Sequence, residues 1–201
     1  MKALILDFGG VLTNDYWEVL RGFARREGLE EDTFLGLFTK DPVGMELLRG
    51  LERGSIGQSR FETELAARLG LSPDGLLKRM GADLRPDEQM LAFVAELRAA
   101  GVKIAVLSNS LGSDYYDPYA PWDLASRCDV VIISDQVRLR KPEPEIFDLV
   151  LEKLGVPASE CLFVDDIAAY LKPAQAKGMA VWHHTSTAAT VAELRRVFSA
   201  G

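Results

Sequence analysis

The chain has 201 residues, of which 48% are hydrophobic and 26% charged, and its formal net charge is −7. This length predicts one large domain, or a domain with a smaller insert, with about 70% of the unfolded surface buried. The acidic balance argues against nucleic acid or an anionic membrane as the main partner. No apolar run approaches the roughly 18 residues of a membrane-spanning helix.

The two cysteines, Cys128 and Cys161, lie in apolar segments. They are predicted to be buried thiols in a reducing compartment rather than a disulfide. The chain starts close to a predicted strand and shows no signal-peptide hydrophobic region. We therefore expect a cytoplasmic protein.

The first predicted strand ends in a polar turn. Residues 3–6 form an unbroken apolar run, typical of a strand buried on both faces of a parallel sheet. Asp7 follows, and Gly9 and Gly10 then let the backbone turn and approach a ligand. Open α/β sheets bind ligands at this edge, although an Asp before glycines is also ordinary turn chemistry.

Residues 14–84 carry helix signals and no strand signal. Apolar spacing and capping residues predict helices over 16–28, 31–39, 43–53, 58–69 and 73–80. Because one helix would suffice to return to the next strand, we interpret 14–84 as a helical cap domain, with 1–13 and 85–201 forming the core domain. An extra helical layer on the core is the alternative.

Strands and helices alternate from residue 86 onward. Strands are predicted over 103–107, 130–133, 161–164 and 179–182, and helices over 87–100, 145–154, 168–177 and 189–198. The pattern predicts an α/β fold with a Rossmann-like, parallel, five-stranded sheet and right-handed crossovers, with the helical cap inserted after strand 1.

Polar residues follow three of these strands, and a lysine begins the helix before the fourth. The set is Asp7, Ser108, Asn109, Lys141, Asp165 and Asp166. Because the carboxyl ends of parallel strands share one edge, we expect these side chains to converge. A hydroxyl, an amide and an ammonium suit phosphate oxygens, and carboxylates suit a hard cation such as Mg²⁺. The pattern indicates a carboxylate nucleophile made approachable by metal and lysine.

The chain resembles the haloacid dehalogenase-like (HAD) hydrolase superfamily in four segments, LILDFGGVL, IAVLSNS, RKPEPEIF and LFVDDIAAYLKPAQAKGM. The resemblance covers essentially the whole chain, with 14–84 in place of the family's helical C1 cap. The fourth segment is particularly similar to the phosphatase domain of soluble epoxide hydrolases and bacterial relatives.

The resemblance implies a Mg²⁺-dependent phosphatase for a small phosphorylated metabolite. Asp7 would attack phosphorus and form an aspartyl-phosphate. Ser108 and Lys141 would hold the phosphate, and Asn109 would help to orient the substrate. Gly10 completes the candidate substrate-binding residues.

The resemblance also implies the metal ligands. Asp7, Asp166 and one backbone carbonyl, that of Gly9, would bind Mg²⁺, with Asp165 as a second ligand or a water-bridged support.

Two positions depart from the family pattern. Gly9 stands where phosphatases of the family carry a second Asp that protonates the leaving group, and such groups contribute about 10²–10⁴-fold. The loss falls hardest on alkyl phosphates, and Asp15 or a metal-bound water could substitute. Tyr170 stands where relatives usually carry an Asn beside the acidic pair, which puts the metal geometry in question.

Two other functions are compatible with these residues. One is a catalytically impaired binding protein with the same fold, and the other is a metal-independent 2-haloacid dehalogenase. The retained pair of Asp165 and Asp166, costly without a cation, argues against the dehalogenase. The apolar surplus of the cap allows a homodimer.

Overall fold

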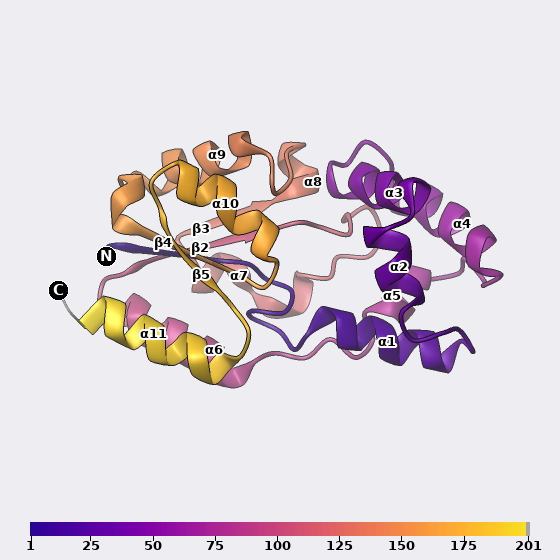
Figure 1. Ribbon diagram of the computed structural model, residues 1–201, viewed down its shortest axis with the longest axis horizontal. Coiled ribbons are helices and arrows are strands. Elements are labelled where there is room, and N and C mark those ends of the chain that lie inside the picture. The colour runs from indigo at the N-terminus through magenta and orange to yellow at the C-terminus, as the bar shows by residue number, and fades with distance from the viewer. Residues whose placement is uncertain (200–201) are drawn as a thin grey trace.

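The computed structural model describes residues 1–199 and contains one parallel sheet (Figure 1). Its strands are β1 (Ala3–Leu6), β2 (Lys103–Ser108), β3 (Val130–Ile133), β4 (Cys161–Asp165) and β5 (Ala180–His183). The order across the sheet is β3-β2-β1-β4-β5. Because the chain builds outward from β1 on one side and then returns to the other side, β1 ends where the strand order reverses, which is where open α/β sheets bind ligands.

Helices cover both faces of the sheet, so the predicted Rossmann-like architecture is confirmed. One layer holds α6 (Glu88–Ala99) and α11 (Thr187–Ser199), and the other holds α9 (Pro144–Leu154) and α10 (Ala168–Ala176). Leu4 and Leu6 of β1 belong to the core shared with α6 and α11, whereas Ala3 and Ile5 belong to the core shared with α9 and α10. Because the side chains of β1 alternate between two apolar layers, its sequence is a continuous apolar run.

Five helices lie between β1 and β2 and pack around an apolar cluster of their own, which includes Phe23, Phe34 and Phe61. They are α1 (Tyr16–Arg26), α2 (Thr33–Thr39), α3 (Pro42–Glu52), α4 (Gln58–Leu69) and α5 (Leu76–Met80). We call this group the cap; in Figure 1 it lies to one side of the sheet. The division into a core of 1–13 and 85–201 and a cap of 14–84 stays a prediction.

The two connections between cap and sheet run side by side. Thr13 and Pro86 form an antiparallel bridge, and the Asp87 amide donates to the Leu12 carbonyl at 2.9 Å. Asn14 adds a side-chain bond, accepting from the Arg85 amide at 2.8 Å. The cap is thus joined to the sheet by one paired hinge.

Some predicted element boundaries are wrong. The helix predicted over 73–80 begins only at Leu76, because the Ser72 hydroxyl accepts from the Asp74 amide and a left-handed Gly75 (φ 58°) completes a turn first. Lys141 does not start a helix. It lies in the loop between α8 (Ser134–Val137) and α9, and α9 begins at Pro144. A short helix, α7 (Leu124–Arg127), precedes β3.

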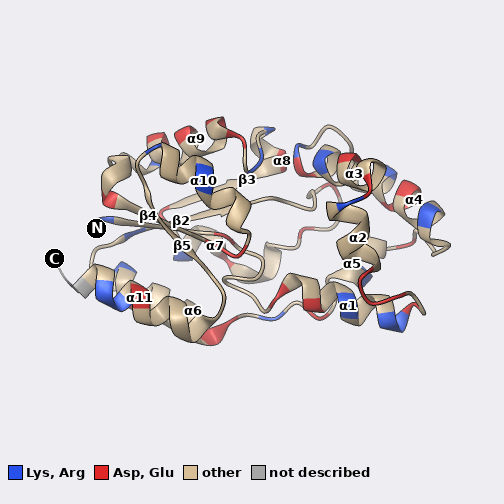
Figure 2. Cartoon of the chain, in the orientation of Figure 1, with Lys and Arg blue, Asp and Glu red and all other residues tan. Residues whose placement is uncertain are grey.

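The two cysteines are free and buried, as predicted. Within residues 1–199 no helix has both the length and the apolar character needed to cross a bilayer. In the view of Figure 2, acidic and basic residues are interspersed over the helices of both the core and the cap.

Candidate active site

Three carboxylates meet at the carboxyl edge of the sheet. Asp7 follows β1, Asp165 ends β4 and Asp166 comes next, and one oxygen from each lies within 4.8 Å of the others. Asp165 is fully buried and Asp7 is 8% exposed. β1 and β4 are direct neighbours in the sheet, and the Asp7 amide donates to the Val164 carbonyl at 2.9 Å. The pairing of β1 with β4 therefore brings the three carboxylates together.

Lys141 supplies the positive charge at this cluster. Its side chain is buried, and its Nζ lies 2.8 Å from Asp7 Oδ1 and 2.6 Å from Asp165 Oδ2. Burial opposes charging of this amine, but the nearby Asp165 and Asp7 carboxylates outweigh burial and raise its pKa. Lys141 is therefore a fixed cation in the site, not a proton carrier near neutral pH.

The pKa values of Asp165 and Asp166 are both raised. Burial raises the pKa of Asp165, and the Asp7 carboxylate adds to this while Lys141 opposes it. Burial also raises the pKa of Asp166, with further contributions from Asp7 and Asp165. When all three carboxylates are ionised, Lys141 leaves two negative charges uncompensated. A divalent cation would balance them, and oxygen ligands of this kind suit Mg²⁺.

Gly10 lies directly beside Asp166. Its φ is 78°, and a Cβ at this position would lie 2.7 Å from Asp166 Oδ2. The Gly10 amide donates to Thr13 Oγ1 at 2.9 Å, so a buried hydroxyl holds the turn. The close approach and the left-handed backbone explain the glycine at position 10.

The Asn109 side chain forms two hydrogen bonds with the backbone of Lys141. Asn109 Oδ1 accepts from the Lys141 amide at 2.8 Å, and Asn109 Nδ2 donates to the Lys141 carbonyl at 3.1 Å. The loop that carries Lys141 is thereby fixed to the end of β2. The predicted substrate-orienting residue also supports the lysine.

Ser108 ends β2, and its Oγ lies 2.8 Å from the hydroxyl of Tyr119. Burial raises the pKa of Tyr119, so this phenol stays protonated and can donate. The Tyr119 ring packs on Phe8, which follows Asp7, with centroids 4.9 Å apart. The pairing of Tyr119 with Ser108 depends on how the loop between β2 and α7 folds.

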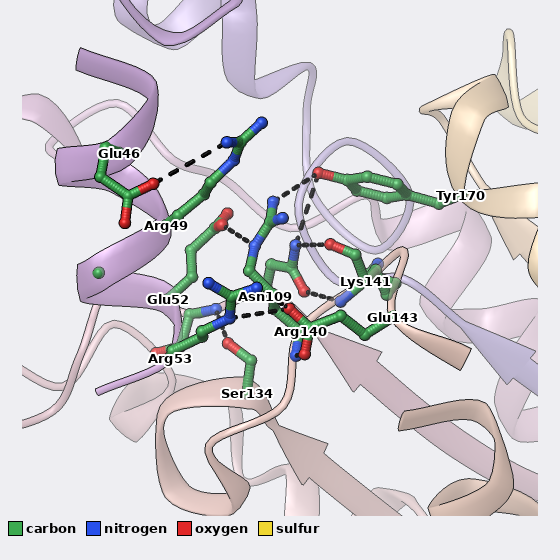
Figure 3. Close-up of polar contacts among 12 residues, drawn as sticks. Glu46, Arg49, Glu52, Arg53, Asn109, Ser134, Arg140, Lys141, Glu143 and Tyr170 are labelled. Carbon is green, nitrogen blue, oxygen red and sulfur yellow. Dashed lines mark hydrogen bonds and ion pairs between the residues drawn. The ribbon is translucent and has the colours of Figure 1, made fainter. Parts of the chain in front are cut away.

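The structure bears on the two positions that depart from the family pattern, Gly9 and Tyr170, and on Asp15 as a substitute for the missing acid. Asp15 caps α1 by accepting from the Trp17 and Glu18 amides, so one of its carboxylate oxygens is already committed. The Tyr170 hydroxyl oxygen accepts from Asn109 Nδ2 at 3.5 Å and from Arg140 Nη2 at 3.4 Å (Figure 3). The Lys141 Nζ also lies 5.3 Å from the centroid of the Tyr170 ring. Tyr170 thus contacts two residues, Asn109 and Lys141, that are predicted to bind substrate.

Glu52 is a buried acidic residue that the sequence analysis missed. It ends cap helix α3, and Arg140 Nε donates to its Oε2 at 2.5 Å across the boundary between cap and core. A charged residue on an otherwise apolar helix face was the available signal, but the partner lies 88 residues away.

Comparisons with known proteins identify a family and several similar proteins. The family model for haloacid dehalogenase-like hydrolases matches residues 1–177. A sesquiterpene phosphatase from Aspergillus oryzae is 30% identical, with 98% of this chain and 96% of that protein covered. A glyceraldehyde 3-phosphate phosphatase from Methanocaldococcus jannaschii is 27% identical, with 89% and 82% covered.

A solved structure with the same fold is a HAD family enzyme from Bacteroides thetaiotaomicron in complex with magnesium and inorganic phosphate. Its TM-score is 0.69 at 23% identity, with 93% of this chain and 95% of that chain covered.

Proposed function

Because the chain belongs to the haloacid dehalogenase-like hydrolases, we propose that it is a Mg²⁺-dependent phosphatase acting on a small phosphate monoester through an aspartyl-phosphate. The chain is a hydrolase, and relatives of it are named phosphatases. The observation that carries the proposal is the contact of the Lys141 ammonium with Asp7 and Asp165 beside Asp166.

Asp7 is the proposed nucleophile. Its Oδ1 accepts from the Phe8 amide at 2.7 Å and from Lys141 Nζ at 2.8 Å. Among the described residues, none donates to its Oδ2 by a hydrogen bond, so Oδ2 is the oxygen we assign to attack. A bond from Oδ2 to phosphorus forms, the ester P–O bond breaks, and the alcohol oxygen leaves with its electron pair.

Water then attacks the phosphorus of the aspartyl-phosphate, which releases inorganic phosphate and restores the Asp7 carboxylate. Lys141 and Ser108 bind the equatorial phosphate oxygens, with Asn109 and the turn at Gly10 beside them. The Lys141 charge stabilises the negative charge on these oxygens through both steps.

Mg²⁺ would be held by Asp7, Asp165, Asp166 and the Gly9 carbonyl, and when bound it would polarise the phosphate and offset the repulsion between the carboxylates. The observation that fits this ion is the gathering of three carboxylates around the single ammonium of Lys141. Burial, and after it the neighbouring Asp7 carboxylate, raises the pKa of both Asp165 and Asp166.

Because residue 9 is glycine, no side chain at this position can protonate the leaving group. An aryl oxide departs without a proton, whereas an alkoxide needs one, so we propose slow turnover with a preference for good leaving groups. The proposed partner is a small phosphorylated metabolite rather than nucleic acid or membrane. A cytoplasmic location and a homodimer remain predictions.

The test is hydrolysis of p-nitrophenyl phosphate with Mg²⁺ and with a chelator, in the wild type, Asp7→Asn and the control Asp148→Asn. The control removes an exposed carboxylate that pairs with Lys177. We expect activity only with Mg²⁺, its loss in Asp7→Asn, and no change in Asp148→Asn. Labelling by acetyl phosphate should detect the phosphoenzyme.

Two results would favour the alternatives. Phosphate binding with no phosphoenzyme would indicate a catalytically impaired binding protein. Metal-independent halide release from a 2-haloacid would indicate a dehalogenase.

A further inference from the structure

An ion pair between the cap and the core is almost entirely buried. The side chains of Glu52 and Arg140 are 9% and 11% exposed, and Arg140 Nε lies 2.5 Å from Glu52 Oε2 (Figure 3). Two charges buried in this way are tolerated because each neutralises the other, and removal of one partner leaves a buried charge uncompensated. The pair therefore holds only while α3 is seated against the core.

Arg140 is the residue before Lys141 in the chain. A guanidinium anchored by Glu52 restricts the backbone on which Lys141 stands, and Asn109 binds that same backbone by two hydrogen bonds. Arg140 Nη2 also lies 3.4 Å from the Tyr170 hydroxyl, which lies 3.5 Å from Asn109 Nδ2. Through Arg140, Glu52 is thus connected to the residues that we assign to phosphate binding in two ways. One is the backbone shared with Lys141, and the other is the Tyr170 hydroxyl, which contacts Asn109.

An exposed ion pair on the same helix provides the control. Glu46 Oε2 lies 3.9 Å from Arg49 Nη1, and these side chains are 73% and 42% exposed (Figure 3). Within residues 1–199, no hydrogen bond joins the Glu46 side chain to Asn109, Arg140 or Lys141. Glu46→Gln therefore makes the same chemical change on α3 away from the core. Arg53 is unsuitable, because its partner Glu143 also accepts from the Arg140 amide at 3.3 Å.

The cap is also seated by contacts that do not involve Glu52. A Cβ on Gly54 would lie 2.7 Å from the Asp135 carbonyl oxygen, so the turn after α3 packs closely against the backbone of α8. The side chain of Gln58 donates to the Leu111 and Tyr116 carbonyls at 3.0 and 2.7 Å. Removal of Glu52 alone therefore leaves the cap attached.

We propose that Glu52 is a positioning residue, which acts through Arg140 to hold the Lys141–Asn109 unit in its phosphate-binding arrangement. This inference rests on the proposed function for its effect on turnover. The expected change in the backbone of Lys141 does not depend on turnover.

The experiment compares Glu52→Gln, the double variant Glu52→Leu/Arg140→Met and the control Glu46→Gln. The double variant replaces both charges by apolar groups, which restores stability if an unpaired buried charge is the only defect. The first measurement is hydrogen exchange of the Lys141 amide in the protein without ligand. The second is the separate determination of kcat and KM for p-nitrophenyl phosphate with Mg²⁺.

We expect faster exchange of the Lys141 amide in Glu52→Gln and in the double variant, and kcat/KM lower by about 10- to 100-fold, the range that a displaced reacting group produces. The double variant should regain thermal stability without regaining kcat/KM. Glu46→Gln should leave both the exchange and kcat/KM within about twofold of the wild type.

Exchange that is unchanged in Glu52→Gln, or accelerated equally in Glu46→Gln, would overturn the proposal. So would recovery of kcat/KM in the double variant, because Glu52 would then contribute stability alone. If the wild type turns over no phosphate ester, the proposed function fails, and the exchange comparison still decides whether Glu52 positions Lys141.

Discussion

A Cβ on Gly9 would lie 3.9 Å from the Cβ of Tyr16, which is an ordinary van der Waals contact. The φ of Gly9 is also outside the left-handed region that favours glycine. Neither space nor backbone geometry therefore requires glycine two residues after the proposed nucleophile. The missing side chain is a chemical difference that one substitution can reverse.

Gly9→Asp should raise kcat/KM for an alkyl phosphate by about 10²-fold or more, because a carboxylic acid then protonates the leaving oxygen. The gain for p-nitrophenyl phosphate should be much smaller. The measurement is the ratio of the two gains, with Gly9→Asn as the control for shape. Equal gains on both esters would contradict the role assigned to Gly9.

Gly10→Ala should destabilise the protein by about 1–2 kcal/mol, because a Cβ is unfavourable at this positive φ. It should also weaken Mg²⁺ binding, since the new methyl group meets Asp166 Oδ2. Gly28→Ala is the matched control, with φ 73° and nothing within 4 Å of its Cβ. Thermal unfolding and Mg²⁺ titration should show strain in both variants and weakened binding in Gly10→Ala alone.

Lys141→Met should destabilise the protein by about 3–5 kcal/mol in urea unfolding without metal, because Asp7 and Asp165 lose their buried counter-charge. Addition of Asp165→Asn should recover part of the loss. Lys177→Met removes a pair whose Asp148 side chain is 64% exposed, so its effect should stay below about 1 kcal/mol. Equal losses in the two lysine variants would be evidence against a strained acidic cluster.

The free energy of unfolding of the metal-free protein should fall as the pH rises from about 4 toward neutrality. The pKa of Asp165 and the pKa of Asp166 are raised in the folded state, chiefly by burial. Between the ordinary Asp pKa near 4 and these raised values, the folded state binds more protons than the unfolded one, so stability decreases with pH.

Mg²⁺ should reverse this trend, because it binds the ionised carboxylates of the folded state. Urea unfolding at several pH values, with and without Mg²⁺, measures the effect. Asp166→Asn should weaken the pH dependence of the unfolding free energy in the metal-free protein. A wild-type unfolding free energy that does not change with pH would contradict the raised pKa values of Asp165 and Asp166.

The sheet could be predicted from residues 3–6, 103–107 and 161–164 because a strand buried on both faces needs an unbroken apolar run. The expectation that Asp7, Asp165 and Asp166 converge followed from the parallel arrangement of the strands. The error at Lys141 has a local cause. The spacing of apolar residues marks the helix, but it does not say how the three residues before Pro144 fold.

Contacts made by side chains from different elements were not predictable. The Ser108–Tyr119 pair depends on the path of an irregular loop, and the Glu52–Arg140 pair joins residues 88 positions apart. The spacing of apolar residues along the sequence does not indicate such a partner, because the pairing depends on how the cap packs on the core.

The sequence by itself determined the order of strands and helices, the edge at which the acidic residues gather and the lack of an acid at Gly9, since each depends on local apolar pattern or residue identity. Only the tertiary structure decided that Lys141 bridges Asp7 and Asp165, that Tyr170 reaches Asn109, and that Glu52 pairs with Arg140. The physical reason is that buried charges are tolerated only beside a partner, and the partner's position is a property of the packed chain.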